Sequence, residues 1–229
     1  MPKLSRLFRW SKKVDIRVND KIVDTVYIRL VGDVVFQDAR KLALKESRTL
    51  RAKLRNTESE EYKSNFSDID FLTKDELVNG ILVGEMSTFR DEAMMEYKVE
   101  EVPELSDNPS MEEQEEHDEK IDALQSKRIK TLTDAIESKA DARKKMLDVM
   151  ENKELISLYT RAMCEVRCTD AFTDTFREYQ VYMGTFTDKS FKVLAFDSFQ
   201  DFRESSATLK ELLTNAYNSL EISGEDLKN

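Results

Sequence analysis

The sequence predicts an α+β fold that is mostly helical. It is expected to comprise an N-terminal β-hairpin followed by helices, a long exposed helix, and a small C-terminal strand pair plus helix. Three observations lead to this prediction. Apolar and polar residues alternate near the start of the chain, which is typical of half-buried strands. Most later apolar residues recur at helical spacing. Only 5 of the 229 residues are glycine and 3 are proline, so the tight turns of an all-β fold are scarce.

The hairpin is predicted between Val14 and Val31. Val14, Ile16 and Val18 alternate with polar residues, and the Asn-Asp-Lys run at 19–21 has turn chemistry. The next ten residues are rich in β-branched side chains, which favour a strand. Because two strands alone are barely stable in water, another element must cover their apolar face. The helix that follows in the sequence is the nearest candidate.

Two long helical patterns follow in the middle of the chain. Thr73 and Glu76 have the spacing of a capping box, which opens a helix with a wide apolar stripe. Gly80 and Gly84 lie four residues apart in that helix, and we expect them to permit the close approach of another element. A sparser pattern begins at Met111 and predicts a long exposed helix or half of a helical hairpin.

The last sixty residues are of mixed type. Aromatic and β-branched residues predict two strands, at 179–186 and 191–196. A short helix is expected near 199–203 and a final amphipathic helix at 209–220.

Composition divides the chain into four segments. Residues 1–99 form the hairpin and a helical module, and 100–122 form an acidic linker that becomes helical. Residues 123–178 form a long helical segment, and 179–229 form the strand and helix segment. The acidic segment has 11 acidic residues and one basic residue, which predicts an exposed stretch.

Charge is unevenly distributed between the two ends of the chain. Residues 1–56 contain 15 Lys+Arg and 6 Asp+Glu, a net charge of +9. The remainder has 21 Lys+Arg and 40 Asp+Glu, a net charge of −19. Such a chain can attract an oppositely charged partner, or its basic part can meet the acidic segment of its own or a neighbouring chain.

The candidate site lies on the predicted helix between Val34 and Asn56. Its apolar residues keep to one face, and cationic residues occupy the rest. We predict a docking surface for a protein partner. A solvated face whose aliphatic stems cover the core edge is the alternative. Nucleic acid is disfavoured, because no aromatic or polar base-reading residues lie among the charges. The candidate partner-binding residues are Arg40, Lys41, Lys45, Arg48, Arg51 and Arg55.

The sequence contains no catalytic, cofactor-binding or metal-binding motif, so we expect a non-enzymatic protein. His117, the sole histidine, lies in the acidic segment, where a solvated side chain is expected. Cys164 and Cys168 lie four residues apart on a predicted helix and are expected to be buried as small apolar residues. No apolar run approaches the length of a membrane span and no signal peptide is recognised, which predicts a soluble intracellular protein.

Three stretches carry a resemblance to a known family: residues 26–30 running into 39–43, residues 50–62 followed by 75–77, and residues 196–202 leading to 212–217. Through these stretches, over about half of its length, the chain resembles the tail assembly chaperones of long-tailed bacteriophages. The resemblance implies a non-enzymatic helper in the host cytoplasm that binds the tape-measure protein and tail-tube subunits during tail assembly. It also implies a mostly helical fold without a cofactor.

Two other functions stay open at this point. One is a structural virion component, such as a tail or connector protein, whose hairpin adds strands to a neighbour. The other is a nucleic-acid-binding regulator that uses the basic part from Leu4 to Arg55. A homo-oligomer is compatible with either function and with the chaperone.

Overall fold

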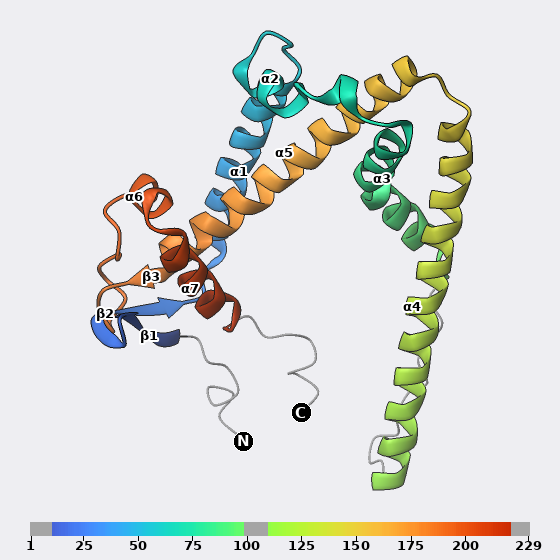
Figure 1. The fold of residues 1–229 in the computed structure, drawn as a ribbon. Helices are drawn as coiled ribbons and strands as arrows, with labels where there is room; N and C mark the ends of the chain where they lie inside the picture. The colour runs from blue at the N-terminus through green and yellow to red at the C-terminus, as the bar shows by residue number, and fades with distance from the viewer. Residues whose placement is uncertain (1–10, 99–109, 221–229) are drawn as a thin grey trace. The chain divides into compact units, whose positions relative to one another are not determined.

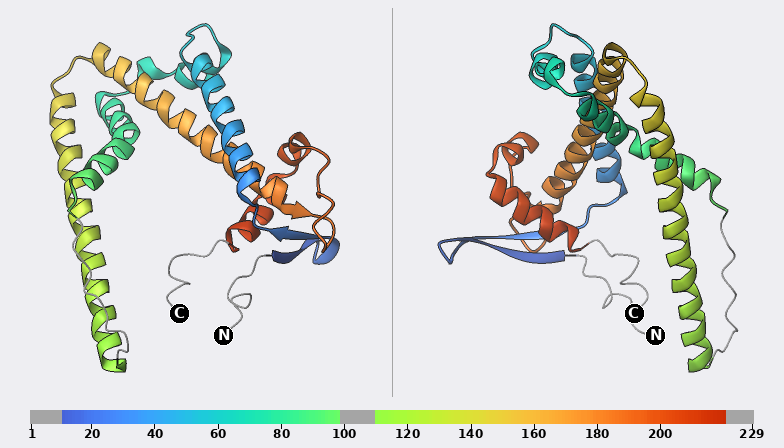
Figure 2. Two further views of the ribbon diagram at one scale, coloured as in Figure 1. Left: turned by 180° about the vertical axis from the view of Figure 1, so that it is seen from behind. Right: turned by 45° about the vertical axis from the view of Figure 1, so that its right-hand side comes forward.

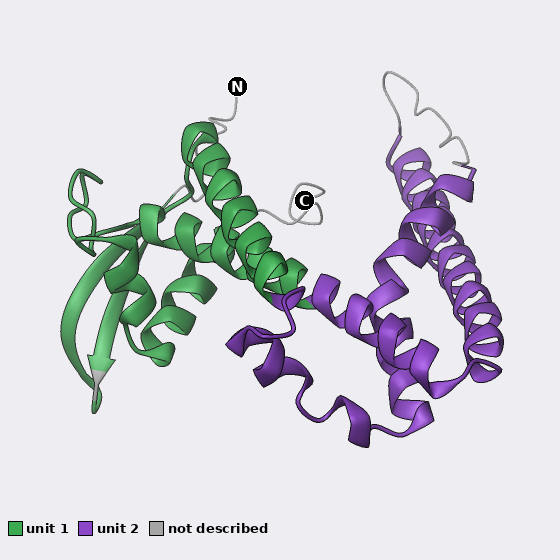
Figure 3. Ribbon diagram, turned by 90° about the horizontal axis from the view of Figure 1, so that it is seen from above, with its two compact units in different colours: residues 1–53, 167–229 green, residues 54–166 purple. Residues whose placement is uncertain are grey.

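The computed structural model describes residues 11–98 and 110–220 (Figure 1). It confirms an α+β fold that is mostly helical. The chain forms two compact units, shown in Figure 3. Unit 1 contains residues 1–53 and 167–229, and unit 2 contains residues 54–166. The unit boundaries thus fall inside two of the compositional segments, 1–99 and 123–178. The first residues of the basic part from Leu4 to Arg55, up to residue 10, lie outside the described residues.

The predicted N-terminal hairpin is present. Strands β1 (Ser11–Val18) and β2 (Lys21–Arg29) are antiparallel, with Val14 opposite Val26. Asn19 and Asp20 form the turn with φ values of 48° and 63°. Asn and Asp adopt this left-handed conformation more readily than other residues with a side chain. A two-residue strand, β3 (Thr185–Phe186), pairs with β2 to give the sheet order β1-β2-β3.

The apolar face of the hairpin is covered by elements from the C-terminal part of the chain. These are the end of α5 (Asn152–Gly184), α6 (Phe199–Glu204) and α7 (Ala207–Asn218). Figure 1 shows α6 and α7 on one side of the strands. The core here contains Val14, Val26, Ile28, Val181, Tyr182, Phe202, Leu213, Ala216, Tyr217 and Leu220. The expectation that the following helix covers the hairpin is therefore wrong.

The predicted C-terminal strand pair is also largely wrong. Residues 179–184 are the last turns of α5, and strand structure is limited to β3. Within 191–196 only Leu194 forms a bridge, to Phe186. Tyr179, Tyr182 and Met183 recur at helical spacing and pack in or against the core beneath the sheet. Burial of this aromatic helix face therefore overrides the β propensity of the individual residues.

The first long helix, α1 (Asp33–Leu54), packs antiparallel to α5 within unit 1. The ring of Phe36 lies edge-on to Phe176, with centroids 4.9 Å apart. Further along, the Ser47 hydroxyl donates a 2.8 Å hydrogen bond to the backbone carbonyl of Cys168. Both cysteines are buried, as predicted.

Unit 2 begins with two short elements, α2 (Glu60–Phe66) and a 3₁₀ helix, η2 (Ile69–Phe71). The next helix, α3 (Lys74–Glu96), opens with the predicted capping box. The backbone N–H of Thr73 donates to Glu76, and the N–H of Glu76 donates to the Thr73 hydroxyl. The two orphan donors at the helix start are thereby satisfied reciprocally.

The long helix α4 (Met111–Asp148) is both exposed and half of a helical hairpin. Its C-terminal half runs antiparallel to α3, which is visible in Figure 2. The Lys74 ammonium donates to the carbonyls of Asp148 and Met150. At the centre of the pair, Arg143 donates two hydrogen bonds to Glu85, of 2.7 and 2.8 Å. One cluster of buried residues in this unit contains Leu77, Val78, Ile81, Leu147 and Leu155.

Candidate functional site

The candidate site is the solvent-facing side of α1. Ala39 and Ala43 are fully buried on the opposite side. Successive helix residues are rotated by about 100°. Arg40, Lys41, Lys45 and Arg48 therefore lie within an arc of about 140° that points away from the alanines. All four are exposed. We call these four residues the cationic face.

Two of the six predicted residues differ from the other four. Arg51 is half-buried and already has an interaction of its own. Arg55 is exposed but follows the last residue of α1 and belongs to unit 2. The structure therefore brings together four of the candidate residues on one face.

The positive charge of the cationic face is largely unneutralised. Lys41 forms an ion pair with Asp38 at 3.3 Å, one turn earlier. Within the described ranges, Arg40 and Arg48 form no ion pair and no hydrogen bond through their side chains. α1 has three carboxylates, those of Asp33, Asp38 and Glu46. The Glu46 carboxylate does not neutralise the face, because it is directed to another helix. The face consequently attracts anionic groups from outside the chain.

Glu46 fixes α1 to the C-terminal elements of unit 1. Its carboxylate accepts two 2.9 Å hydrogen bonds from Arg203 and one of 2.7 Å from the Thr175 hydroxyl. The Arg203 guanidinium also donates to Glu178 at 3.0 Å and lies over the ring of Phe199. Every part of the guanidinium thus has a neighbour that holds it in place.

The pKa of Glu46 is lowered from its usual value of 4.5 by this arrangement. Partial burial acts to raise the pKa, but the hydrogen bonds from Arg203 and Thr175 and the charge of Arg203 outweigh it. The carboxylate is therefore ionised at neutral pH and is committed to holding α1. The sequence did not reveal this network, because its members are up to 157 positions apart.

A groove of about 260 Å³ runs along α1 beside the cationic face. Its described lining comes from α1 alone: Leu42, Lys45, Glu46, Thr49, Leu50 and Lys53. Lys45 belongs both to the groove and to the cationic face. A bound segment with acidic side chains could place apolar groups on the two leucines and carboxylates near the lysines.

The four cationic residues together form a charged, solvent-exposed helix face. Among residues 11–98 and 110–220, no group of three or more His, Cys, Asp or Glu side chains is placed to hold a metal ion. Within the same ranges, no helix combines the length and apolarity needed to cross a membrane. No protein-family model, curated protein or solved structure matches this chain.

Proposed function

We propose that this protein is a non-enzymatic assembly chaperone of the kind found in long-tailed bacteriophages. It acts in the host cytoplasm and binds a tape-measure protein and tail-tube subunits during tail assembly. The cationic face of α1 provides the contact with the partner. The single structural observation that supports this proposal is the exposure of four cations on one helix face, at least two of them without a partner among the described residues. The sequence resemblance supplies the biological setting.

The chemistry of the face suits a helper that must release its partner. Exposed ion pairs contribute little to stability and are screened by salt. A contact made of several such pairs forms quickly, because charge complementarity acts mainly on the rate of association. It dissociates readily, because each exposed pair contributes little to its stability. An assembly factor that hands its partner to tail-tube subunits needs this reversibility.

A structural virion protein is the second candidate, and one feature of the sheet favours it. β1 is an edge strand of eight residues, and its outer edge has no neighbour in the described sheet. An extended segment of another protein could add to it. Against this, the strand contains Lys12, Lys13 and Arg17 and an irregularity beside Ile16, features that commonly protect strand edges from pairing.

The copy number in finished particles separates the two functions. The full-length chain is co-expressed with the tape-measure and tail-tube proteins of the same genome, and its complexes are isolated. Finished virions are then analysed by quantitative mass spectrometry. A chaperone co-purifies with the tape-measure protein and is depleted from virions. Stoichiometric amounts in finished virions would contradict the proposal and support the structural function.

A further inference from the structure

The two units carry opposite net charges. Unit 1 contains 21 Lys+Arg and 17 Asp+Glu, a net charge of +4. Unit 2 contains 15 Lys+Arg and 29 Asp+Glu, a net charge of −14. The cationic face belongs to unit 1. Its electrostatic counterpart in the same sequence is therefore to be sought on unit 2.

That counterpart is a row of glutamates on the N-terminal half of α4. Glu112, Glu115, Glu116 and Glu119 are spaced i, i+3, i+4 and i+7, so they share one side of the helix. All four are exposed. Glu116 forms an ion pair with Lys120 at 2.7 Å. The other three have no ion pair and no hydrogen bond through their side chains within the described ranges. We call these four residues the glutamate face.

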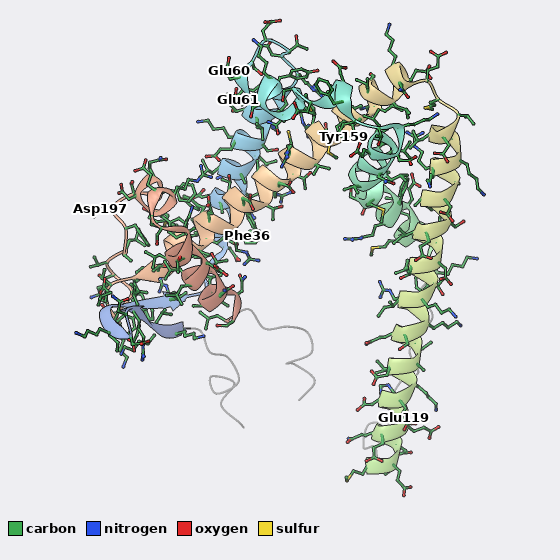
Figure 4. The ribbon with its side chains drawn as sticks, viewed as in Figure 1. Phe36, Glu60, Glu61, Glu119, Tyr159 and Asp197 are labelled. Atoms are coloured by element: carbon green, nitrogen blue, oxygen red, sulfur yellow. The ribbon has the colours of Figure 1, made fainter. Side chains whose placement is uncertain are left out.

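The glutamate face lies beyond the part of α4 that pairs with α3. At one end of the helix pair, the Lys74 ammonium donates to the carbonyl of Asp148. At the other end, the Arg128 guanidinium lies over the ring of Tyr97. Tyr97 directly follows the last residue of α3. Figure 4 shows Glu119 on the stretch of α4 that continues past this point. α3 therefore leaves the glutamate face open.

The two faces match in length as well as in sign. At a rise of about 1.5 Å per residue, Arg40 to Arg48 spans about 12 Å and Glu112 to Glu119 spans about 10 Å. Two helices placed side by side can thus bring these charges opposite each other along most of their length. Complementary rows of charge of this kind select a partner and its register.

We propose that the cationic face of α1 docks a second copy of this chain through the glutamate face of its α4. This inference does not rest on the proposed function, although both use the same face of α1. If both hold, self-association and partner binding compete, so that the free chain covers its docking surface until a partner displaces the second copy.

The contact should be weak and should respond strongly to salt. Screening reduces the range of charge interactions to about 10 Å at 0.1 M salt and about 3 Å at 1 M. Sedimentation velocity of the full-length chain over a concentration series measures the association. We expect concentration-dependent dimers or larger species at low salt, and a roughly tenfold weaker association when NaCl is raised from about 0.05 M to about 0.5 M.

Charge reversal tests the two faces separately. Arg40→Glu/Arg48→Glu should abolish the low-salt association, and so should Glu115→Lys/Glu119→Lys. The matched controls are Lys153→Glu/Arg161→Glu, which has the same spacing on exposed positions of α5, and Glu137→Lys/Asp141→Lys, which has the same spacing on exposed positions of α4. Both controls should associate like the parent chain.

The variant that carries both charge reversals tests whether the two faces contact each other. Arg40→Glu/Arg48→Glu/Glu115→Lys/Glu119→Lys should recover association, because the signs of both faces are exchanged. Circular dichroism confirms that each variant keeps its helix content. A parent chain that is monomeric at every concentration and salt, as a contact within one chain would give, overturns the proposal. Loss of association in a control, or no recovery in the combined variant, also overturns it.

Discussion

Gly84 of α3 lies so close to Ala162 of α5 that a Cβ atom on the glycine would be 2.7 Å from the Ala162 Cβ and 3.2 Å from its backbone. One turn earlier, a Cβ on Gly80 would overlap the ring of Tyr159, which Figure 4 labels. Both contacts lie within unit 2. The two glycines have a low helix propensity, but they allow the two helices to pack closely, as the sequence predicted.

Gly84→Ala should lower the free energy of unfolding of unit 2. Overpacking destabilises by about 1–3 kcal/mol, and the better helix propensity of alanine offsets about 1 kcal/mol of this loss. We expect a net loss of up to about 2 kcal/mol in urea denaturation followed by circular dichroism. Asn79→Ala, at an exposed position of the same helix, serves as the control and should change stability little. A stabilised Gly84→Ala variant would show that the helices separate without penalty.

The bond between Glu46 and Arg203 should contribute measurably to the stability of unit 1. Hydrogen bonds to charged groups are worth about 1.5–3 kcal/mol when partly buried. A double-mutant cycle with Glu46→Ala and Arg203→Ala should give a coupling energy of about 1–2 kcal/mol. The same cycle on the exposed pair Asp38 and Lys41 should give much less, since exposed ion pairs contribute little. Equal coupling in both cycles would contradict the anchoring role of Glu46.

The ionisation of Glu46 should make the stability of the folded chain depend on pH. The pKa of Glu46 is lower in the folded chain than its usual value of 4.5. Its contribution is therefore complete above pH 4.5 and is lost as the pH falls through the lowered pKa. The difference in unfolding free energy between the parent chain and Glu46→Gln should shrink on acidification below pH 4.5. A difference that stays constant through this range would argue against an ionised Glu46 in the folded state.

Asp188 should titrate with a pKa of about 2 instead of 3.8. The largest cause is the hydrogen bond from the Ser190 hydroxyl, and the backbone N–H groups of Val193 and Lys192 add to it at 2.9 and 3.0 Å. NMR titration of the carboxyl carbon measures the value. Asp188→Asn should accelerate hydrogen exchange at these two amides, whereas Asp197→Asn should leave them unchanged. An ordinary pKa at Asp188 would mean that the loop is not closed around this carboxylate.

The elements that the sequence predicted correctly depend on neighbouring residues. The hairpin follows from alternation and a turn at Asn19 and Asp20, and the start of α3 follows from the Thr73 capping box. The cationic face of α1 was predictable for the same reason, because helical spacing alone places Arg40 and Arg48 together.

The incorrect predictions depend on contacts between distant parts of the chain. Residues 179–184 were predicted as a strand from their composition, but the buried side of α5 is decided by packing with α6 and α7. The sequence did not predict which elements cover the hairpin, because these elements come from the other end of the chain. The network around Glu46 was missed as well, since no local pattern pairs it with Arg203.

The cationic face of α1 is proposed to bind a protein partner. Co-purification of the tape-measure protein with the full-length chain, quantified for Arg40→Glu/Arg48→Glu and for the control Lys153→Glu/Arg161→Glu, tests it most directly. We expect capture by the parent chain and the control, and at least a tenfold loss for the α1 variant, since reversed charges repel an acidic partner. Equal capture by all three chains, or capture by none, would contradict it.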